Sequence, residues 1–302
     1  MRALAIAAIG LVAATMSAEA QQAEPDIIVE AQRIQEAARS FARDVSAPPS
    51  REDQLARFDD RICPGVVGLN RRQGQFLADR IGQRALELNL EVGEPGCRAN
   101  VLVLVTQTPS DVARAIAEEE RHLVANYGVQ ENLNTRGEEA LAHFISDERP
   151  VRWWHVAQTV TRDGEVLRNV QTQMWGGSNS SPHYVAEVVR ANPLSASQNA
   201  APTQQQFRNV VIIVDANRAR AVRLDGLADY VSMVAFAQLA PEADTRGYDT
   251  VLNLFSGESA VTSMTDWDRA YLTGLYTVDP NATSARRQAG RIATEMTETL
   301  AH

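Results

Sequence analysis

The sequence predicts an α+β (or α/β) fold, in which a mixed sheet has two central buried strands packed by helices and one disulfide. Two apolar runs carry this prediction, VLVLV at 101–105 and VVIIV at 210–214. Neither run alternates with polar residues, which is typical of strands buried on both faces. Each run is followed by a segment with helical periodicity, so we expect strand–helix units around one core.

The first twenty residues have the features of a secretory signal peptide. Arg2 gives a basic start, an apolar run covers 3–16, and Ala18-Glu19-Ala20 is a small-x-small cleavage site. The alternative is an uncleaved N-terminal anchor helix, but the run is short for a membrane span. We therefore expect a periplasmic or secreted chain with no integral membrane segment after cleavage.

The charge of the chain narrows the classes of partner and of chemistry. The formal net charge is −9, which argues against nucleic acid as the main partner. All 29 basic side chains are arginine, because the sequence contains no lysine. That excludes Schiff-base chemistry, Ser-x-x-Lys hydrolases and the P-loop lysine. The partner that we expect is a protein or a small molecule of the cell envelope.

Residues 21–50 are polar and alanine-rich, and the proline pair at 48–49 would end a helix expected over 27–45. We interpret this segment as a loosely attached lead-in, partly helical or disordered. Residues 51–302 are expected to form a single α+β domain, since a chain of this length can bury one large core.

The first unit of that domain is strand–helix–strand over 55–106. ARFDDRIC (56–63) is the expected first strand, Asn70 caps a helix that ends near residue 89, and Gln73 stands at its third position. Apolar residues recur on the inner side of this helix, namely Leu77, Ile81, Ala85 and Leu88. The side expected to face water carries Arg71, Arg72, Asp79, Arg80, Arg84 and Glu87.

A disulfide between Cys63 and Cys97 would join the ends of the two strands. It closes a loop of 34 residues, worth about 3.5–4 kcal/mol in the chain-entropy model. The alternative is two free buried thiols. Neighbouring strands would bring the two Cα atoms to about 4.4–6.8 Å.

Two helices are expected between 108 and 150. Thr108 and Pro109 begin the first, which runs to about residue 127. Thr135 begins the second, in a capping box with Glu138, and it ends before Pro150.

A β-hairpin is expected over 151–175, because two β-rich runs flank an Asp-Gly turn at 163–164. The segment 176–206 is rich in Gly, Ser, Asn, Pro and Gln. A loop of this length is functional or disordered, and a short helix at 185–190 interrupts it.

The strand and helix over 207–241 form the expected centre of the domain, with the helix at 225–239. Three further helical pieces are expected in the C-terminal part, 248–300, at 248–255, 265–276 and 284–300. Thr265 and Asp268 form a second capping pair.

Metal and nucleophile motifs are weak. Metal binding needs several converging ligands, and no two histidines lie three or four residues apart; they are His122, His143, His155, His183 and His302. His183 and Glu187 could share a helix face, but one such pair is a weak signal for a metal site. We therefore interpret the histidines as surface residues or as buried residues with hydrogen-bond partners. No metal or cofactor is expected. The serines near 178–181 lack a Gly-x-Ser-x-Gly elbow, and no glycine-rich phosphate loop follows 210–214.

The helix at 225–239 is apolar on nearly every side, so its few polar groups need partners. Asp229 is a candidate acid with a raised pKa; the preferred alternative is that Asp225 and Asp229 favour the helix N-terminus. Trp153, Trp154 and Trp175 form either a ligand platform or cross-strand packing, which is the more common role. The candidate ligand cleft comprises Trp153, His155, His183, Asp229, Tyr230 and Ser232. No catalytic residue is assigned.

Three segments carry a resemblance to a known family. They are Cys63-Pro64-Gly65 through Cys97, LADYVSMVAFAQLAPEADT (227–245), and TVLNLF with MTDWDRAYLTGLY (250–276). Together they are similar to a family of exported proteins, with no assigned activity, from alphaproteobacteria of the sphingomonad kind.

The order of elements is also similar to that of zincin-like metallopeptidase domains, in which a helix bears His-Glu-x-x-His. Here Asp229, Tyr230 and Met233 stand where the two histidines and the glutamate would be. The resemblance therefore implies a degenerate, non-catalytic version without a three-ligand zinc site.

We therefore expect an exported, non-catalytic binding or envelope-associated protein, a pseudoenzyme if the zincin resemblance holds. The alternative is a periplasmic hydrolase with a site near Asp229 or in the 176–206 loop. A third reading is a secreted stress or assembly factor whose lead-in is the working part. Convergence of His155, His183, Asp229 and Tyr230 in one pocket would favour an enzyme, and scattered positions would favour binding.

Overall fold

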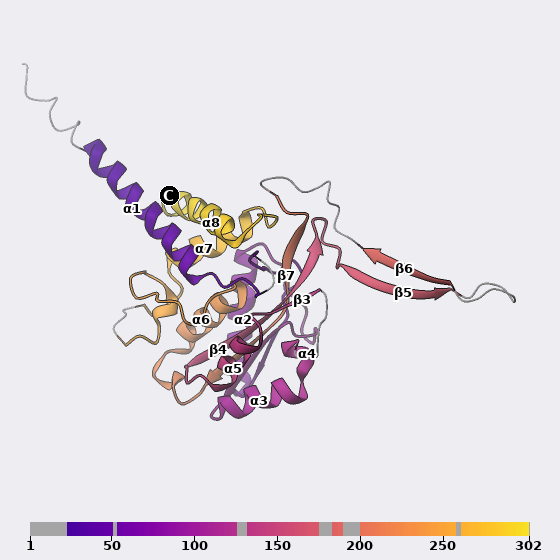
Figure 1. Ribbon diagram of the computed structural model, residues 1–302. Helices are drawn as coiled ribbons and strands as arrows, with labels where there is room; N and C mark the ends of the chain where they lie inside the picture. The colour runs from indigo at the N-terminus through magenta and orange to yellow at the C-terminus, as the bar shows by residue number, and fades with distance from the viewer. Residues whose placement is uncertain are drawn as a thin grey trace, which may run out of the picture.

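The computed structural model describes residues 23–50, 53–125, 132–174, 183–189, 200–257 and 261–301. The expected signal peptide lies outside these residues. The main sheet has five strands in the order β1-β2-β7-β4-β3 (Figure 1). The neighbours β1 (Pro64–Val67), β2 (Val101–Thr106) and β7 (Thr203–Asp215) are parallel, whereas β4 (Val151–Thr161) and β3 (Leu133–Asn134) extend the sheet in antiparallel fashion. The predicted mixed sheet in an α+β fold is confirmed.

Helices cover both faces of this sheet (Figure 1). One face carries α3 (Pro109–Glu119), α4 (Arg121–Val124) and α5 (Glu138–Ser146). On the other side are α1 (Ala23–Val45), α2 (Arg71–Glu87), α6 (Leu224–Phe236), α7 (Asp266–Thr277) and α8 (Ala285–Leu300). In β7, Val210, Ile212 and Val214 enter the core with α2 and α6, while Val211 and Ile213 enter the core with α3, α4 and α5. Burial on both faces is the reason why this run does not alternate.

Both predicted central strands lie inside the sheet. β2 has β1 and β7 as neighbours, and β7 has β2 and β4. The predicted first strand, 56–63, is wrong in position: β1 begins after Cys63, at Pro64. Residues 54–56 are buried, but side chains hold them instead of a ladder, since Gln288 accepts from Leu55 N and Gln238 from Ala56 N.

The predicted hairpin over 151–175 is also wrong. The Asp-Gly turn forms, with Gly164 at φ +85° and its N–H donating to Thr161 O, but only one bridge, Val160 to Val166, follows it. β4 is buried along its whole length and takes β7 as its partner, because the core offers it more apolar contact than a solvated hairpin would.

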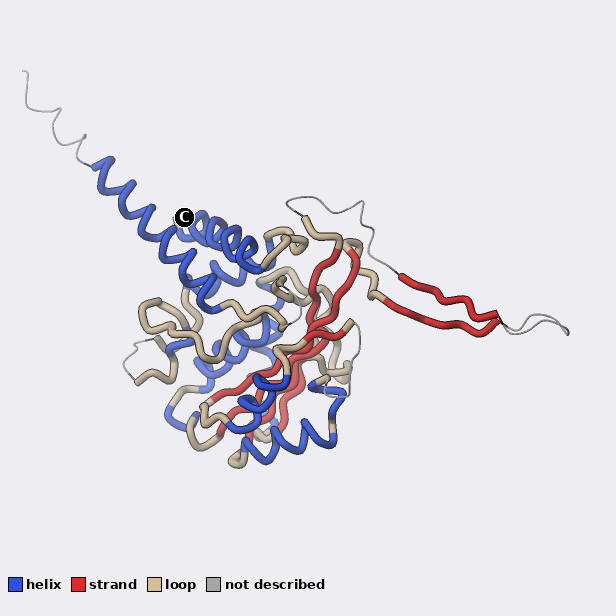
Figure 2. Tube along the Cα trace, viewed as in Figure 1, coloured by secondary structure: helices blue, strands red, loops and turns tan. Residues whose placement is uncertain are grey.

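β5 (Arg168–Met174) instead pairs with β6 (His183–Val189) in a separate two-stranded ribbon. This ribbon projects from the body of the molecule (Figures 1 and 2). The short helix predicted at 185–190 is therefore wrong, because β6 occupies that part of the chain. Trp175 and residues 176–182 lie outside the described part.

The interpretation of residues 21–50 as loosely attached is wrong for the second half of the segment. Ala38, Phe41, Ala42 and Val45 of α1 are buried in the main core. Phe41 makes edge contacts with three aromatic rings, those of Tyr248, Trp267 and Tyr271. The first turns of α1 project beyond the body (Figure 1).

Two of the predicted helix starts are confirmed in detail. Asn70 Oδ1 accepts from Gln73 N at 3.0 Å, and Thr265 and Asp268 form a reciprocal capping box. The box predicted at Thr135 does not form, because Gly137, at φ +90°, precedes the first turn of α5. A glycine is required there, since this φ strains other residues.

Other boundaries also differ from the prediction. The helix expected to reach residue 127 is broken into α3 and α4, and the one expected at 248–255 is a single 3₁₀ turn, Val251–Asn253. Within the described ranges, no helix is long and apolar enough to cross a bilayer.

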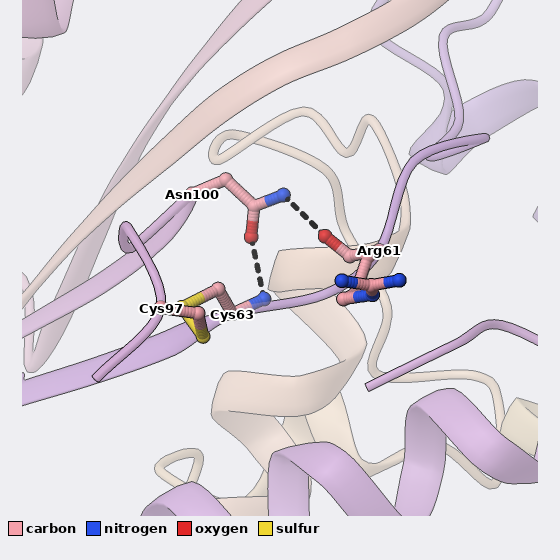
Figure 3. The surroundings of a disulfide bond; sticks show 4 residues. All are labelled: Arg61, Cys63, Cys97 and Asn100. Carbon is pink, nitrogen blue, oxygen red and sulfur yellow. Dashed lines mark hydrogen bonds between the residues drawn. A yellow bond between two sulfur atoms is a disulfide. The ribbon is translucent and has the colours of Figure 1, made fainter. Parts of the chain in front are cut away.

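The predicted disulfide is confirmed, with the Cα atoms of Cys63 and Cys97 6.0 Å apart (Figure 3). Asn100 stands beside it, where its Oδ1 accepts from Cys63 N at 2.8 Å and its Nδ2 donates to Arg61 O at 2.9 Å (Figure 3). The amide thus adds to the main-chain bonds that Ile62 and Cys63 make just before β1, and it ties Cys63 to the loop that leads into β2.

Candidate functional site

Asp229 lies in the second turn of α6, and its side chain is fully buried. It accepts five hydrogen bonds. Oδ1 accepts from Arg80 Nε (2.8 Å), Arg84 Nε (3.0 Å) and Arg84 Nη2 (2.9 Å), while Oδ2 accepts from Arg80 Nη2 (3.1 Å) and Met264 N (3.0 Å). The carboxylate therefore joins α2, α6 and the segment before α7.

The two arginines are one helical turn apart on α2, so they reach the same carboxylate. The side chain of Arg84 is only 5% exposed, and that of Arg80 is 26% exposed. The prediction that Arg84 faces water is wrong. Its position was readable in the sequence, because Leu77, Ile81, Arg84 and Leu88 follow the i, i+4, i+7, i+11 spacing of one helix face.

Burial acts to raise the pKa of Asp229, but the hydrogen bonds from Arg80 and Met264 N and the charge of Arg84 outweigh it, so the pKa lies below its ordinary value. The candidate acid with a raised pKa is therefore wrong. The alternative, a carboxylate at the helix N-terminus, describes Asp225 in the first turn but not Asp229. Asp229 is an ion-paired clamp between helices.

The neighbours of Asp229 on α6 point elsewhere. Ser232 Oγ donates to Ala228 O at 2.8 Å, a bond within the helix. Tyr230 packs edge-on against Trp153 and Phe255, with ring centroids 6.4 and 5.2 Å apart. Burial raises the pKa of Tyr230 above its ordinary value.

Trp153 and His155 come from β4 and contact the α6 side of the sheet. Trp153 Nε1 donates to Leu239 O at 3.1 Å. His155 Nε2 lies 2.8 Å from Val234 O, and its ring stacks on Phe207 at 4.8 Å. Burial lowers the pKa of His155 to about 4, so the imidazole is neutral at pH 7.

Trp153 and Trp154, the two described members of the possible ligand platform, are packing residues instead. Trp154 enters the core on the opposite face from Trp153, and its Nε1 donates to Val124 O at 3.1 Å. Trp175 lies outside the described residues. His183 begins β6, in the ribbon that projects from the body (Figures 1 and 2).

The six predicted cleft residues thus separate into several places. Trp153 and Tyr230 line a common cavity of about 270 Å³, Trp153 and His155 line a second of about 440 Å³, and Asp229 lines neither. Among the described residues, no group of three or more His, Cys, Asp or Glu is placed to hold a metal ion.

The larger cavity is the candidate binding site. It lies between α5, the outer edge of β4 and the segment after α6, and Ala140, His143 and Phe144 form its α5 wall. Glu139 also belongs to this wall, and the remaining lining is mostly charged or polar, namely Arg136, Asp147, Arg149, Arg152 and Glu242, together with Pro241 and residues of β4.

Two arginines bind the segment Pro241–Glu242, which we call the strap and which lines the cavity. Arg136 Nη2 donates to Glu242 Oε1 at 2.5 Å, and Arg149 donates to Pro241 O. The exposed fractions of the Arg136 and Glu242 side chains are 27% and 59%, so the pair lies at the mouth of the cavity. Ion pairs this exposed contribute little stability, so the Arg136–Glu242 contact is weak, whereas Pro241 is also held by Arg149 and the adjoining Ala240 N donates to Val45 O.

Arg152 is the buried cation of the site. The residue is 4% exposed, Nη1 donates to Phe144 O and Ile145 O, and Nη2 donates to Ser110 Oγ. These bonds cap the C-terminus of α5, where a cation is favourable. Burial lowers the pKa of Arg152. Sequence reasoning missed these arginines, because the strap residues that Arg136 and Arg149 bind lie 106 and 92 residues away from them in the chain.

Comparisons with protein-family models, curated proteins and solved structures each found no match for this chain.

Proposed function

We propose that this chain is an exported, non-catalytic binding protein of the envelope that takes up its ligand in the cavity beside the edge of β4. The single observation that carries the proposal is a cavity of about 440 Å³ whose wall includes part of a strand edge. The volume falls in the usual range of binding pockets, about 300–1,000 Å³.

The state of the ionisable groups supports binding rather than catalysis. A hydrolase centred on Asp229 would need a carboxyl that can exchange protons near neutral pH, but Asp229 is held ionised by Arg80 and Arg84. His155 lines the cavity, yet its Nε2 is already engaged with Val234 O. The segment 176–206, the other place considered for a hydrolase, is described only in part.

The periplasmic location is likewise part of the proposal. The basic start, apolar run and small-x-small site of residues 1–20 support export, and a Cys63–Cys97 disulfide is typical of an oxidising compartment. The resemblance that the sequence suggests, to exported alphaproteobacterial proteins and to degenerate zincin-like domains, would imply the same binding role.

The experiment places a photo-crosslinking amino acid at Ala140, on the cavity wall, in the mature protein expressed in its native envelope. The matched control is Ala142, which is exposed on the same helix but does not line the cavity. Crosslinked products are expected from position 140 and not from position 142. Equal yields from both positions, or none from position 140, would contradict a binding site here.

A further inference from the structure

The strand β3 ends the sheet after only two residues and leaves most of β4 without a partner on its outer side. Leu133 pairs with Gln158 and Asn134 with Ala157, and Asn132 O accepts from Thr159 N. No other strand of the described chain lies on this side of β4. The stretch 151–156 is therefore an edge, although the residues are buried by helices above and below.

The register fixes which main-chain groups of this edge face outward. Asp215 N donates to Pro150 O, so 150 and 215 form a hydrogen-bonded antiparallel pair. Such pairs alternate along a ladder. The N–H and C=O groups of Val151, Trp153 and His155 consequently point away from β7. Among the described residues, no backbone partner for the outward groups of Trp153 and His155 is seen.

The chain leaves this edge at a definite place. Directly after β3, Thr135 O accepts from Ser50 N and not from β4. Gly137, at φ +90°, then turns the backbone into α5. Had β3 continued in register, residue 136 would face His155 and residue 138 would face Trp153. α5 begins at Glu138 instead, and its Ala140 lines a cavity in place of the missing strand.

Both cavities of the site lie along this edge. The larger one is lined by Trp153 and His155, the smaller one by Val151 and Trp153, and they share Arg149 and Pro241. Each of the three outward residues thus lines at least one cavity. From Val151 to His155 the edge is about 14 Å long, at 3.4 Å per residue. Of the strap, Pro241 lines both cavities and Glu242 lines only the larger one.

We infer that the ligand is an extended peptide segment that adds to β4 as an antiparallel strand, in line with β3; this rests on the proposed function of the same cavity. Its main chain bonds to His155, Trp153 and Val151, and its side chains alternate between the α5 side and the α6 side of the sheet. Strand addition at an unpaired sheet edge is a general mode of peptide recognition, and here the cavities give access to an edge whose residues are otherwise buried. The Arg136–Glu242 pair opens to admit it.

The test uses random twelve-residue peptides displayed on phage and selected on the mature, disulfide-bonded protein. Peptides are kept if Ala140→Trp abolishes their binding and Ala142→Trp does not. Each is then resynthesised with single N-methyl groups along its backbone. Loss of about tenfold or more in affinity at every second position, with little change between, is expected, because only alternate N–H groups of a strand bond to its neighbour.

Each outcome is decisive. Peptides that need the cavity but show no period-two sensitivity would overturn strand addition, while the binding function would stand. Failure to select any peptide that Ala140→Trp blocks would also overturn the inference, and the crosslinking at position 140 then decides the proposed function separately. If Ala140→Trp lowers the urea midpoint, His143→Trp, on the same wall, replaces it.

Discussion

Replacement of Asp229 by Asn tests the ion-paired clamp between α2 and α6. The substitution keeps the size of the side chain but removes the charge that Arg80 and Arg84 share. Arg84, only 5% exposed, would retain Glu87 at 2.7 Å, but Glu87 is itself 40% exposed. Breaking a buried pair from one side costs about 3–5 kcal/mol. We expect Asp229→Asn to lower the free energy of unfolding by about that amount.

The structure also predicts which arginine partner of Asp229 contributes more to the free energy of unfolding. Arg80 is 26% exposed, so water screens its bond, and Arg80→Gln should cost less than Arg84→Gln. The matched control is Asp225→Asn, on the same helix, whose partner Arg223 is exposed; a loss of less than about 1 kcal/mol is expected. Urea unfolding followed by tryptophan fluorescence measures all four variants at pH 7.

The dependence on pH has a definite sign. The pKa of Asp229 is lower in the folded than in the unfolded state, so the folded state binds the proton more weakly. Its stabilisation is therefore complete above the ordinary Asp pKa of about 3.9 and is lost as the pH falls through the lower folded-state value. Asp229→Asn should lack this acid-dependent loss. A cost below about 1 kcal/mol at pH 7, or equal to that of Asp225→Asn, would refute the clamp.

Three further predictions concern other parts of the chain. Cys63→Ala should lower stability by about 2–4 kcal/mol without abolishing the fold, less than the full chain-entropy figure because β1 and β2 already restrain the loop; full reaction of the native protein with a thiol reagent would contradict the bond. The pKa of His155 falls to about 4 on folding, so the folded state loses stability as the pH drops from about 6.5 towards 4. Between pH 7 and 5 the free energy of unfolding of the wild type should fall by about 2 kcal/mol more than that of His155→Gln. The glutamine is a suitable control because it can still donate to Val234 O. Equal losses in the two proteins would show that His155 does not titrate in this way. Elemental analysis of the dialysed mature protein should find less than one zinc per chain, and one tightly held zinc would overturn the degenerate zincin interpretation.

Local signals in the sequence predicted the framework correctly. The runs at 101–105 and 210–214 are interior strands, Asn70 and Thr265 cap their helices, and Cys63 pairs with Cys97. Each of these depends on residues close together in the chain or, for the disulfide, on the only two cysteines present. The pattern of apolar residues is sufficient to predict the strands, the capping residues to predict the helix starts, and the expected oxidising compartment to predict the disulfide.

Tertiary structure alone decided the candidate site. Asp229 looked like a lone buried acid until α2 brought Arg84 against it, from 145 residues away. The Asp-Gly turn suggested a hairpin, but β4 found a longer, more apolar partner in β7, and β3 was too short to cover its other side. A strand's own sequence sets its propensity and its buried face, whereas the competition among distant strands for its two edges sets its neighbours. The free edge of β4 results from that competition, and no local pattern encodes it.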